Sequence, residues 1–213
     1  MRTDELIEAL SAKSKPVNRF EVELRVAAGL GVGAAVAVAV VVFLIGVRPD
    51  IARAAATPAF WLKFVFTGAV SMAAMALSCR LGRPACKVRV LWWAVAAPLA
   101  LVIVGAAAEL AMAPASHRLG LWLGSSWMVC PALIFLLSIP ACLGMLWAFR
   151  RLAPTQLRLA GFGAGLAAGA IGASAYALVC RESSMAFMAT WYVLGILAVG
   201  AMGALLGPRV LRW

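Results

Sequence analysis

Charged side chains are scarce in this chain, and their scarcity excludes an ordinary soluble domain. Only 13% of the 213 residues are Asp, Glu, Lys or Arg, whereas 65% are hydrophobic, and the mean hydropathy is +0.99. A soluble fold has no means of hiding so much apolar surface from water. Because little chain is left outside the apolar segments, a soluble catalytic domain is excluded as well. We therefore expect a protein that is not an enzyme.

Residues that several cofactor chemistries require are also missing. The single histidine, His117, argues against a haem held by paired histidines and against a histidine metal cage. None of the 5 cysteines forms a CxxC pair, which disfavours a thioredoxin-like redox enzyme. The chain also has no series of carboxylates within its apolar segments of the kind that forms a proton path. We expect no cofactor, and the sequence leaves a metal site undecided.

Long apolar stretches dominate what is present. A helix needs about 20 apolar residues to cross a hydrocarbon core of about 30 Å. Six such stretches can be drawn, approximately over residues 26–47, 59–79, 90–113, 121–149, 159–179 and 186–206. The sequence predicts an all-α integral membrane protein, in which a bundle of six transmembrane helices spans residues 25–213 and a polar segment, 1–24, precedes it.

The basic residues are distributed unevenly between the two sides of these predicted spans. One side, formed by both termini and the second and fourth loops, contains 14 of the 19 Lys and Arg residues. The opposite side has Arg48, Arg53, Arg118 and Arg181, and Lys63 lies inside the second span. The positive-inside rule therefore predicts that both termini are cytoplasmic. The net charge of +11 is explained by membrane orientation, and we expect no direct binding of nucleic acid.

The polar segment 1–24 has the pattern of a short amphipathic helix. Leu6, Ile7 and Leu10 form one narrow apolar strip on that helix, and Pro16 ends or bends it. One interpretation is a tail that lies on the lipid headgroups. The other is a docking helix for a cytosolic partner, because so short a helix is marginal in water and gains stability by burying its strip in a groove.

Small residues recur every four positions in the fifth span. Gly161, Gly165 and Gly169 form a smooth stripe on one helix face, which allows another helix to approach closely. We predict that this stripe packs inside the bundle. The alternative is that it pairs two copies of the chain in a homodimer.

Two ionisable residues lie inside predicted spans and are functional candidates for that reason. Lys63 and Glu109 both fall toward the outer ends of their helices, at a similar depth that allows them to pair. Such a pair would suit the polar path of a small-solute permease or exporter. The plainer interpretation is that Lys63 extends to the outer interface and that Glu109 marks the end of its span.

Two cysteines fall at the outer side of the predicted bundle. Cys180 follows the fifth span, and a fourth span that ends at Phe149 begins about 20 residues earlier, close to Cys130. Both thiols then border an oxidising compartment, where thiols can pair, oxidise or bind soft metal ions. The alternative is two inert cysteines that only fill space in the core.

Several short segments are similar to one known family. The segments are residues 3–7 (TDELI), Cys130, residues 137–141 (LSIPA), 151–155 (RLAPT), 176–180 (YALVC), Phe187, 191–196 (WYVLGI) and 207–213 (GPRVLRW). They resemble the NrsF-type proteins, which are six-span inner-membrane negative regulators of an extracytoplasmic-function sigma factor in proteobacteria. The resemblance extends over most of the chain, and its C-terminal third is the most specific part.

This resemblance implies a function and assigns roles to residues. It implies an anti-sigma factor of the bacterial inner membrane, whose cytoplasmic N-terminal segment, with Leu6, Ile7 and Leu10, sequesters the sigma factor. It also implies that Cys130 and Cys180 sense oxidants or heavy metals and so release the sigma factor. The chain departs from the family beside Cys180, where His and Pro are replaced by Val179 and Arg181. The missing histidine weakens a metal-binding role there and leaves thiol oxidation open.

Overall fold

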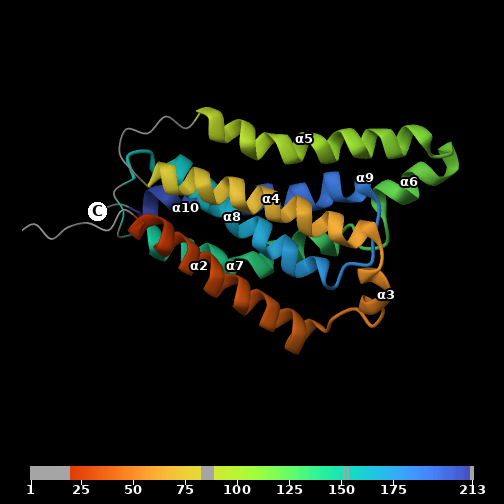
Figure 1. Ribbon diagram of the computed structural model, residues 1–213, viewed down its shortest axis with the longest axis horizontal. Helices are drawn as coiled ribbons and strands as arrows, with labels where there is room; N and C mark the ends of the chain where they lie inside the picture. The colour runs from red at the N-terminus through yellow and green to blue at the C-terminus, as the bar shows by residue number, and fades with distance from the viewer. Residues whose placement is uncertain (1–19, 83–88, 151, 153, 212–213) are drawn as a thin grey trace, which may run out of the picture.

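The chain folds into a single bundle of helices (Figure 1). A computed structural model describes residues 20–82, 89–150, 152 and 154–211, and within these ranges there is no strand. The elements are α2 (Glu21–Val40) with η1 (Val41–Ile45), α3 (Ile51–Ala55), α4 (Pro58–Leu81), α5 (Arg89–Met112), α6 (Ala115–Leu123), α7 (Val129–Phe149), α8 (Leu157–Ala177), α9 (Met185–Phe187) with η2 (Met188–Tyr192), and α10 (Val193–Val210).

Six helical stretches are long and apolar enough to cross a membrane. They are Glu21–Ile45, Pro58–Leu81, Arg89–Met112, Val129–Phe149, Leu157–Ala177 and Met185–Val210. The predicted helical class and the predicted number of spans are confirmed, and the six stretches indicate a multi-pass membrane protein. The first span begins earlier than predicted, so the boundary at residues 24–25 falls inside α2. The proposed docking strip of Leu6, Ile7 and Leu10 lies outside the described residues.

The fourth apolar stretch, predicted over residues 121–149, does not form one continuous helix. A short helix, α6, is followed by a turn, and α7 then begins at Val129. Gly124 ends α6 with a φ of 58°, a conformation that residues with a Cβ rarely adopt. This break places Cys130 in the first turn of a span. His117 lies in α6.

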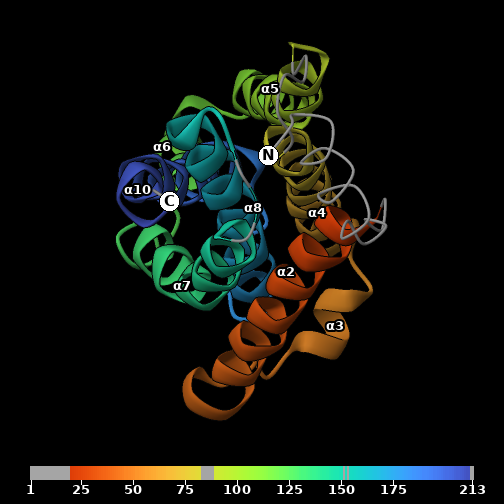
Figure 2. The ribbon, with the colours of Figure 1, turned by 90° about the vertical axis from the view of Figure 1, so that its left-hand side faces the viewer.

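Helix α8 lies at the centre of the bundle, surrounded by α4, α7 and α10 (Figure 2). Within an apolar stretch of 18 residues, 78% of α8 is buried inside the protein, against 17% of the peripheral helix α5. A Cβ built on Gly161 would lie 2.1 Å from the carbonyl oxygen of Gly203, and one on Gly165 would lie 2.4 Å from that of Val199. The predicted packing role of the stripe is confirmed. Because α10 covers this face within one chain, a homodimer would have to use another surface.

Helices α2 and α7 meet through a second close contact between small residues. A Cβ on Gly29 would lie 2.6 Å from the carbonyl oxygen of Gly144, and one on Gly33 would lie 2.2 Å from the Cα of Ala141. Two backbones can approach this closely only where side chains are absent or very small. These two contact regions explain why apolar helices without a large amphipathic face associate in one specific arrangement.

Candidate functional site

Cys130 and Cys180 lie at the same end of the bundle. Cys130 is in the first turn of α7, Cys180 follows the end of α8, and these two helices pack against each other in opposite directions. The exposed fractions of the two residues are 0% and 2%, and both thiols are free. The two side chains are close enough to interact electrostatically. The structure therefore brings together the two candidate residues that the sequence separates by 50 positions.

Two tyrosines complete the surroundings of the thiols. The rings of Tyr176 and Tyr192 are 5.7 Å apart, and both side chains interact electrostatically with Cys130 and Cys180. Tyr192 is 0% exposed, and its buried hydroxyl lies beside the thiol of Cys180. It is the last residue of η2, a π-helical turn of a type that is frequent at functional sites. Tyr192 could not be predicted from the sequence, because only packing places it beside the thiols.

The backbone at Cys180 is held by two cations. Its carbonyl oxygen accepts hydrogen bonds from Nζ of Lys63 and from Nη1 of Arg48, each at 3.1 Å. The amide of Arg48 also donates to the carbonyl of Leu178 at 3.3 Å. Lys63 is only 4% exposed, and its ammonium reaches toward the segment after α8. These contacts join the segment after α8 to α4 and to the segment after η1.

Arg48 also forms an ion pair that lies outside the membrane-spanning segments. Its Nε donates to Oδ1 of Asp50 at 2.8 Å, and its Nη2 donates to Oδ2 at 2.7 Å. This bidentate contact lowers the pKa of Asp50 to about 2 and raises the pKa of Arg48. Because the folded-state pKa of the carboxyl is depressed, the pair stabilises the fold above the ordinary Asp pKa of about 4. That contribution is lost as the pH falls through about 2.

Glu109 has partners of its own and does not pair with Lys63. Its Oε2 accepts hydrogen bonds from Oγ of Ser184 and from the amide of Ala186, both at 2.8 Å. Within the described residues the ion pairs are Arg25–Glu21 and Arg48–Asp50. The pairing that their similar depth allowed is therefore not formed. A similar depth along two helices does not bring two side chains together when the helix faces that bear them are turned toward different neighbours.

The role of Glu109 can be tested through stability. The carboxylate is placed at the N-terminal end of α9, beside the capping side chain of Ser184, where the helix dipole favours negative charge. We expect Glu109→Gln to lower the free energy of unfolding by about 1–2 kcal/mol, because charge-assisted hydrogen bonds become neutral ones. Glu21→Gln, which removes a half-exposed ion pair, should cost less than about 0.5 kcal/mol. Equal unfolding curves in detergent for the two variants would contradict this assignment.

A metal site is not evident from this geometry. No group of three or more His, Cys, Asp or Glu side chains that is able to hold a metal ion occurs among the residues that the structure describes. The neighbourhood of the thiols contains hydroxyl groups and cations, from Tyr176, Tyr192, Lys63 and Arg48.

Comparison with known proteins decides the family. Residues 10–213 match the NrsF family, described as "Negative regulator of sigma F". The chain belongs to the NrsF family. Two NrsF proteins align with it over 100% of both chains: the "Probable anti-sigma-F factor NrsF" of Azospira oryzae, 39% identical over 217 residues, and the "Anti-sigma-F factor NrsF" of Caulobacter vibrioides, 36% identical over 215 residues. No solved structure matches the chain.

These findings confirm the resemblance seen in the short segments. The NrsF family match begins at residue 10, so Leu6 and Ile7 precede it, whereas the alignments to the two NrsF relatives include the whole chain. The match covers every membrane-spanning helix and both candidate cysteines.

Proposed function

We propose that this chain is an inner-membrane anti-sigma factor that sequesters an extracytoplasmic-function sigma factor and releases it in response to oxidant or heavy-metal stress. The observation that supports this function most directly is the full-length similarity to two proteins named anti-sigma-F factors. In this proposal the N-terminal segment holds the sigma factor, and Cys130 and Cys180 receive the signal.

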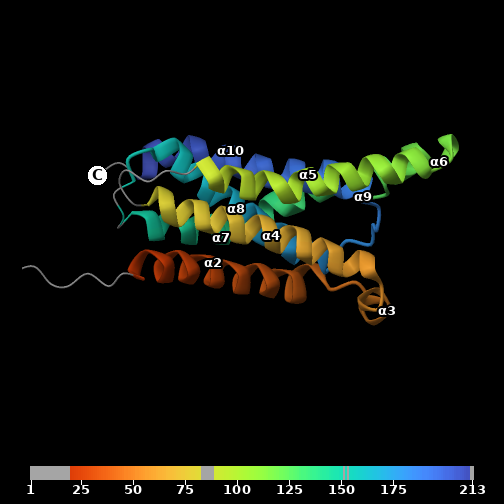
Figure 3. The same cartoon turned by 45° about the horizontal axis from the view of Figure 1, so that its top comes forward.

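The arrangement of the bundle is consistent with a signal that crosses the membrane. The start of α2 and the end of α10 lie at one end, whereas α3, α6 and the two cysteines lie at the other (Figure 3). The end where α2 begins and α10 ends is also the side predicted to hold most of the basic residues. By the positive-inside rule this end faces the cytoplasm, where a sigma factor is available, and the cysteines face the oxidising side.

The docking step uses the apolar strip of the N-terminal segment. Leu6, Ile7 and Leu10 are spaced for one face of a helix, and a groove on the sigma factor would bury that face. Because the segment continues directly into α2, the captured sigma factor is held at the membrane and away from promoters.

The sensing step changes the contact between α7 and α8. If an oxidant accepts two electrons, the two thiols lose two protons and form one S–S bond between the start of α7 and the segment after α8. A soft metal cation has a comparable effect when it displaces the protons and bridges the two sulfurs. Either event favours a new packing at this end of the bundle. Release follows because the sigma factor binds one packing more tightly than the other.

Co-purification tests the docking step. The full chain and a chain that lacks residues 1–15 are solubilised in detergent and incubated with sigma factors from the same organism. We expect the full chain to retain one sigma factor, and the truncated chain to lose essentially all of it because the apolar strip is absent. Leu6→Asp together with Leu10→Asp should have the same effect in the full-length chain. Retention of the sigma factor by the truncated chain at full-length levels would rule out docking through this segment.

The alternative function, a small-solute permease or exporter, loses its main support. It depended on a polar path formed by Lys63 and Glu109 at one depth in the membrane, but the two side chains have separate partners. If substitutions at both positions abolished solute flux and left sigma-dependent transcription unchanged, the transport function would be favoured.

A further inference from the structure

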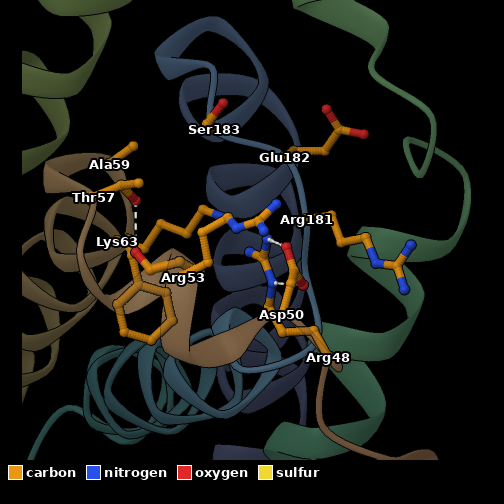
Figure 4. A pocket seen from close by; sticks show the side chains of 11 residues that line it. Arg48, Asp50, Arg53, Thr57, Ala59, Lys63, Arg181, Glu182 and Ser183 are labelled. Atoms are coloured by element: carbon orange, nitrogen blue, oxygen red, sulfur yellow. Dashed lines mark hydrogen bonds and ion pairs between the residues drawn. The ribbon is translucent and has the colours of Figure 1, made fainter.

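A charged pocket lies beside Cys180 at the same end of the bundle. Its volume is about 200 Å³, and it is formed by the segment after η1, by α3, by the start of α4 and by the segment between α8 and α9 (Figure 4). Four basic residues, Arg48, Arg53, Lys63 and Arg181, line it together with two acidic ones, Asp50 and Glu182.

The charges in this pocket do not cancel. Asp50 is occupied by its bidentate contact with Arg48, and Glu182 accepts hydrogen bonds from the amide and hydroxyl of Ser125 at 2.8 and 2.6 Å. Figure 4 shows the side chains of Arg53 and Lys63 extending toward Arg48, while Glu182 is turned away from them. Among the described residues, neither Arg53 nor Lys63 forms an ion pair. The pocket is therefore positively charged.

In the part of the chain that the structure describes, the buried ammonium group of Lys63 lacks a compensating negative charge. Lys63 is 4% exposed, and within the described residues its ammonium donates one hydrogen bond, to the carbonyl of Cys180. An ammonium group has three N–H donors, and burying a cation is costly unless an opposite charge compensates it. A carbonyl oxygen supplies only a partial charge. An anion in the pocket would satisfy the remaining donors and supply the missing charge.

The N-terminus of α4 adds backbone N–H donors to the positively charged pocket. Ala59 and Phe60, in the first turn of this 24-residue helix, line the pocket. Thr57 precedes the helix, but its hydroxyl donates to the carbonyl of Ala54 and does not cap the first turn. The amides of that turn therefore have no side-chain cap, and the positive end of the helix dipole lies at the pocket.

We propose that this pocket binds a phosphate group, held by Nζ of Lys63, the guanidinium of Arg53 and the first-turn amides of α4. A volume of about 200 Å³ accommodates a phosphate group with some water. The group comes either from free inorganic phosphate or from the headgroup of a phospholipid. Because Lys63 also holds the carbonyl of Cys180, a bound phosphate group orders the segment that contains this cysteine. The inference does not depend on the anti-sigma function.

Calorimetric titration tests the free-anion source. The full chain is purified in detergent without phosphate and titrated with sodium phosphate at constant ionic strength. We expect saturable binding that is weakened about tenfold or more by Lys63→Met and by Arg53→Gln, because each removes a charge-assisted hydrogen bond. The matched control is Arg118→Gln, in α6 at the same end, whose guanidinium donates to the carbonyls of Ala111 and Ala113 outside the pocket. This control should bind phosphate like the unmodified chain.

Native mass spectrometry tests the lipid source. The protein is extracted from bilayers that contain phosphatidylglycerol, and the retained lipids are counted. Retention that is lost in Lys63→Met and Arg53→Gln but kept in Arg118→Gln assigns the pocket to a lipid headgroup. If Lys63→Met does not fold, Arg53→Gln decides, because Arg53 is exposed and lies outside the core. If neither phosphate binding nor lipid retention depends on Arg53 and Lys63, the proposal is overturned.

Discussion

Gly161→Leu is expected to prevent the bundle from assembling. The Cβ of any larger residue at this position would lie 2.1 Å from the carbonyl oxygen of Gly203, and no side-chain rotation relieves a collision with backbone. Helices α8 and α10 would have to separate along the most extensive helix contact within the described residues. We expect a loss of more than about 3 kcal/mol in the free energy of unfolding, measured by SDS titration of the detergent-solubilised protein.

A matched control for this substitution lies in α4. A Cβ added at Gly68 meets no atom within 4 Å, so Gly68→Leu places the same side chain in a transmembrane helix without a collision. We expect Gly68→Leu to give monodisperse protein in near-normal yield, while Gly161→Leu aggregates or is degraded. If both variants unfolded at the same SDS concentration, the close packing of α8 on α10 would not be what holds the bundle together.

Cys130→Ser and Cys180→Ser are each expected to make the protein insensitive to the stress signal. Either substitution leaves one sulfur, which can neither form the intramolecular bond nor bridge a metal ion with its partner. In cells, sigma-dependent transcription should remain repressed after oxidant is added, whereas the unmodified protein should allow an increase on the order of tenfold, which is typical of coupling between two sites. A reporter gene behind a sigma-dependent promoter measures this difference.

Cys142 provides the control for the sensing experiment. It is a free cysteine on the same helix as Cys130, and it is also buried, with an exposed fraction of 2%. Cys142→Ser should therefore keep the full response. Capture of the sigma factor in unstressed membranes should be unchanged in all three variants, which separates sensing from docking. A normal response in both Cys130→Ser and Cys180→Ser would eliminate the thiol pair as the sensor.

Several features of the fold could be predicted because they depend on one helix at a time. The length of an apolar stretch determines whether a helix can cross a membrane, and six stretches were long enough. Glycines spaced by four predicted a close helix contact, although not that α10 would be the neighbour. The division between α6 and α7 was missed, because the apolar residues continue on both sides of Gly124 and hydropathy alone does not detect a residue with positive φ.

The site was harder to predict, because its residues come from segments far apart in the chain. Depth in the membrane placed Cys130 and Cys180 at the outer side, and the family resemblance implied their sensing role. Depth does not specify the direction in which a side chain points around its helix. For that reason Lys63 and Glu109, at similar depth, have separate partners. Arg48 and Tyr192 were not selected at all. Arg48 reaches the carbonyl of Cys180 across 132 positions of sequence, a contact that no local pattern indicates.

The sequence by itself therefore determined the class of this protein, its number of spans and its family. These properties follow from the apolar length of each segment and from short segments that can be recognised without knowing their neighbours. Only the tertiary structure decided that two buried thiols, two tyrosines and two cations meet at one end of the bundle. The physical reason is that helix rotation and choice of neighbour are set by the close contacts of α8 with α10 and of α2 with α7, where missing side chains allow backbones to touch.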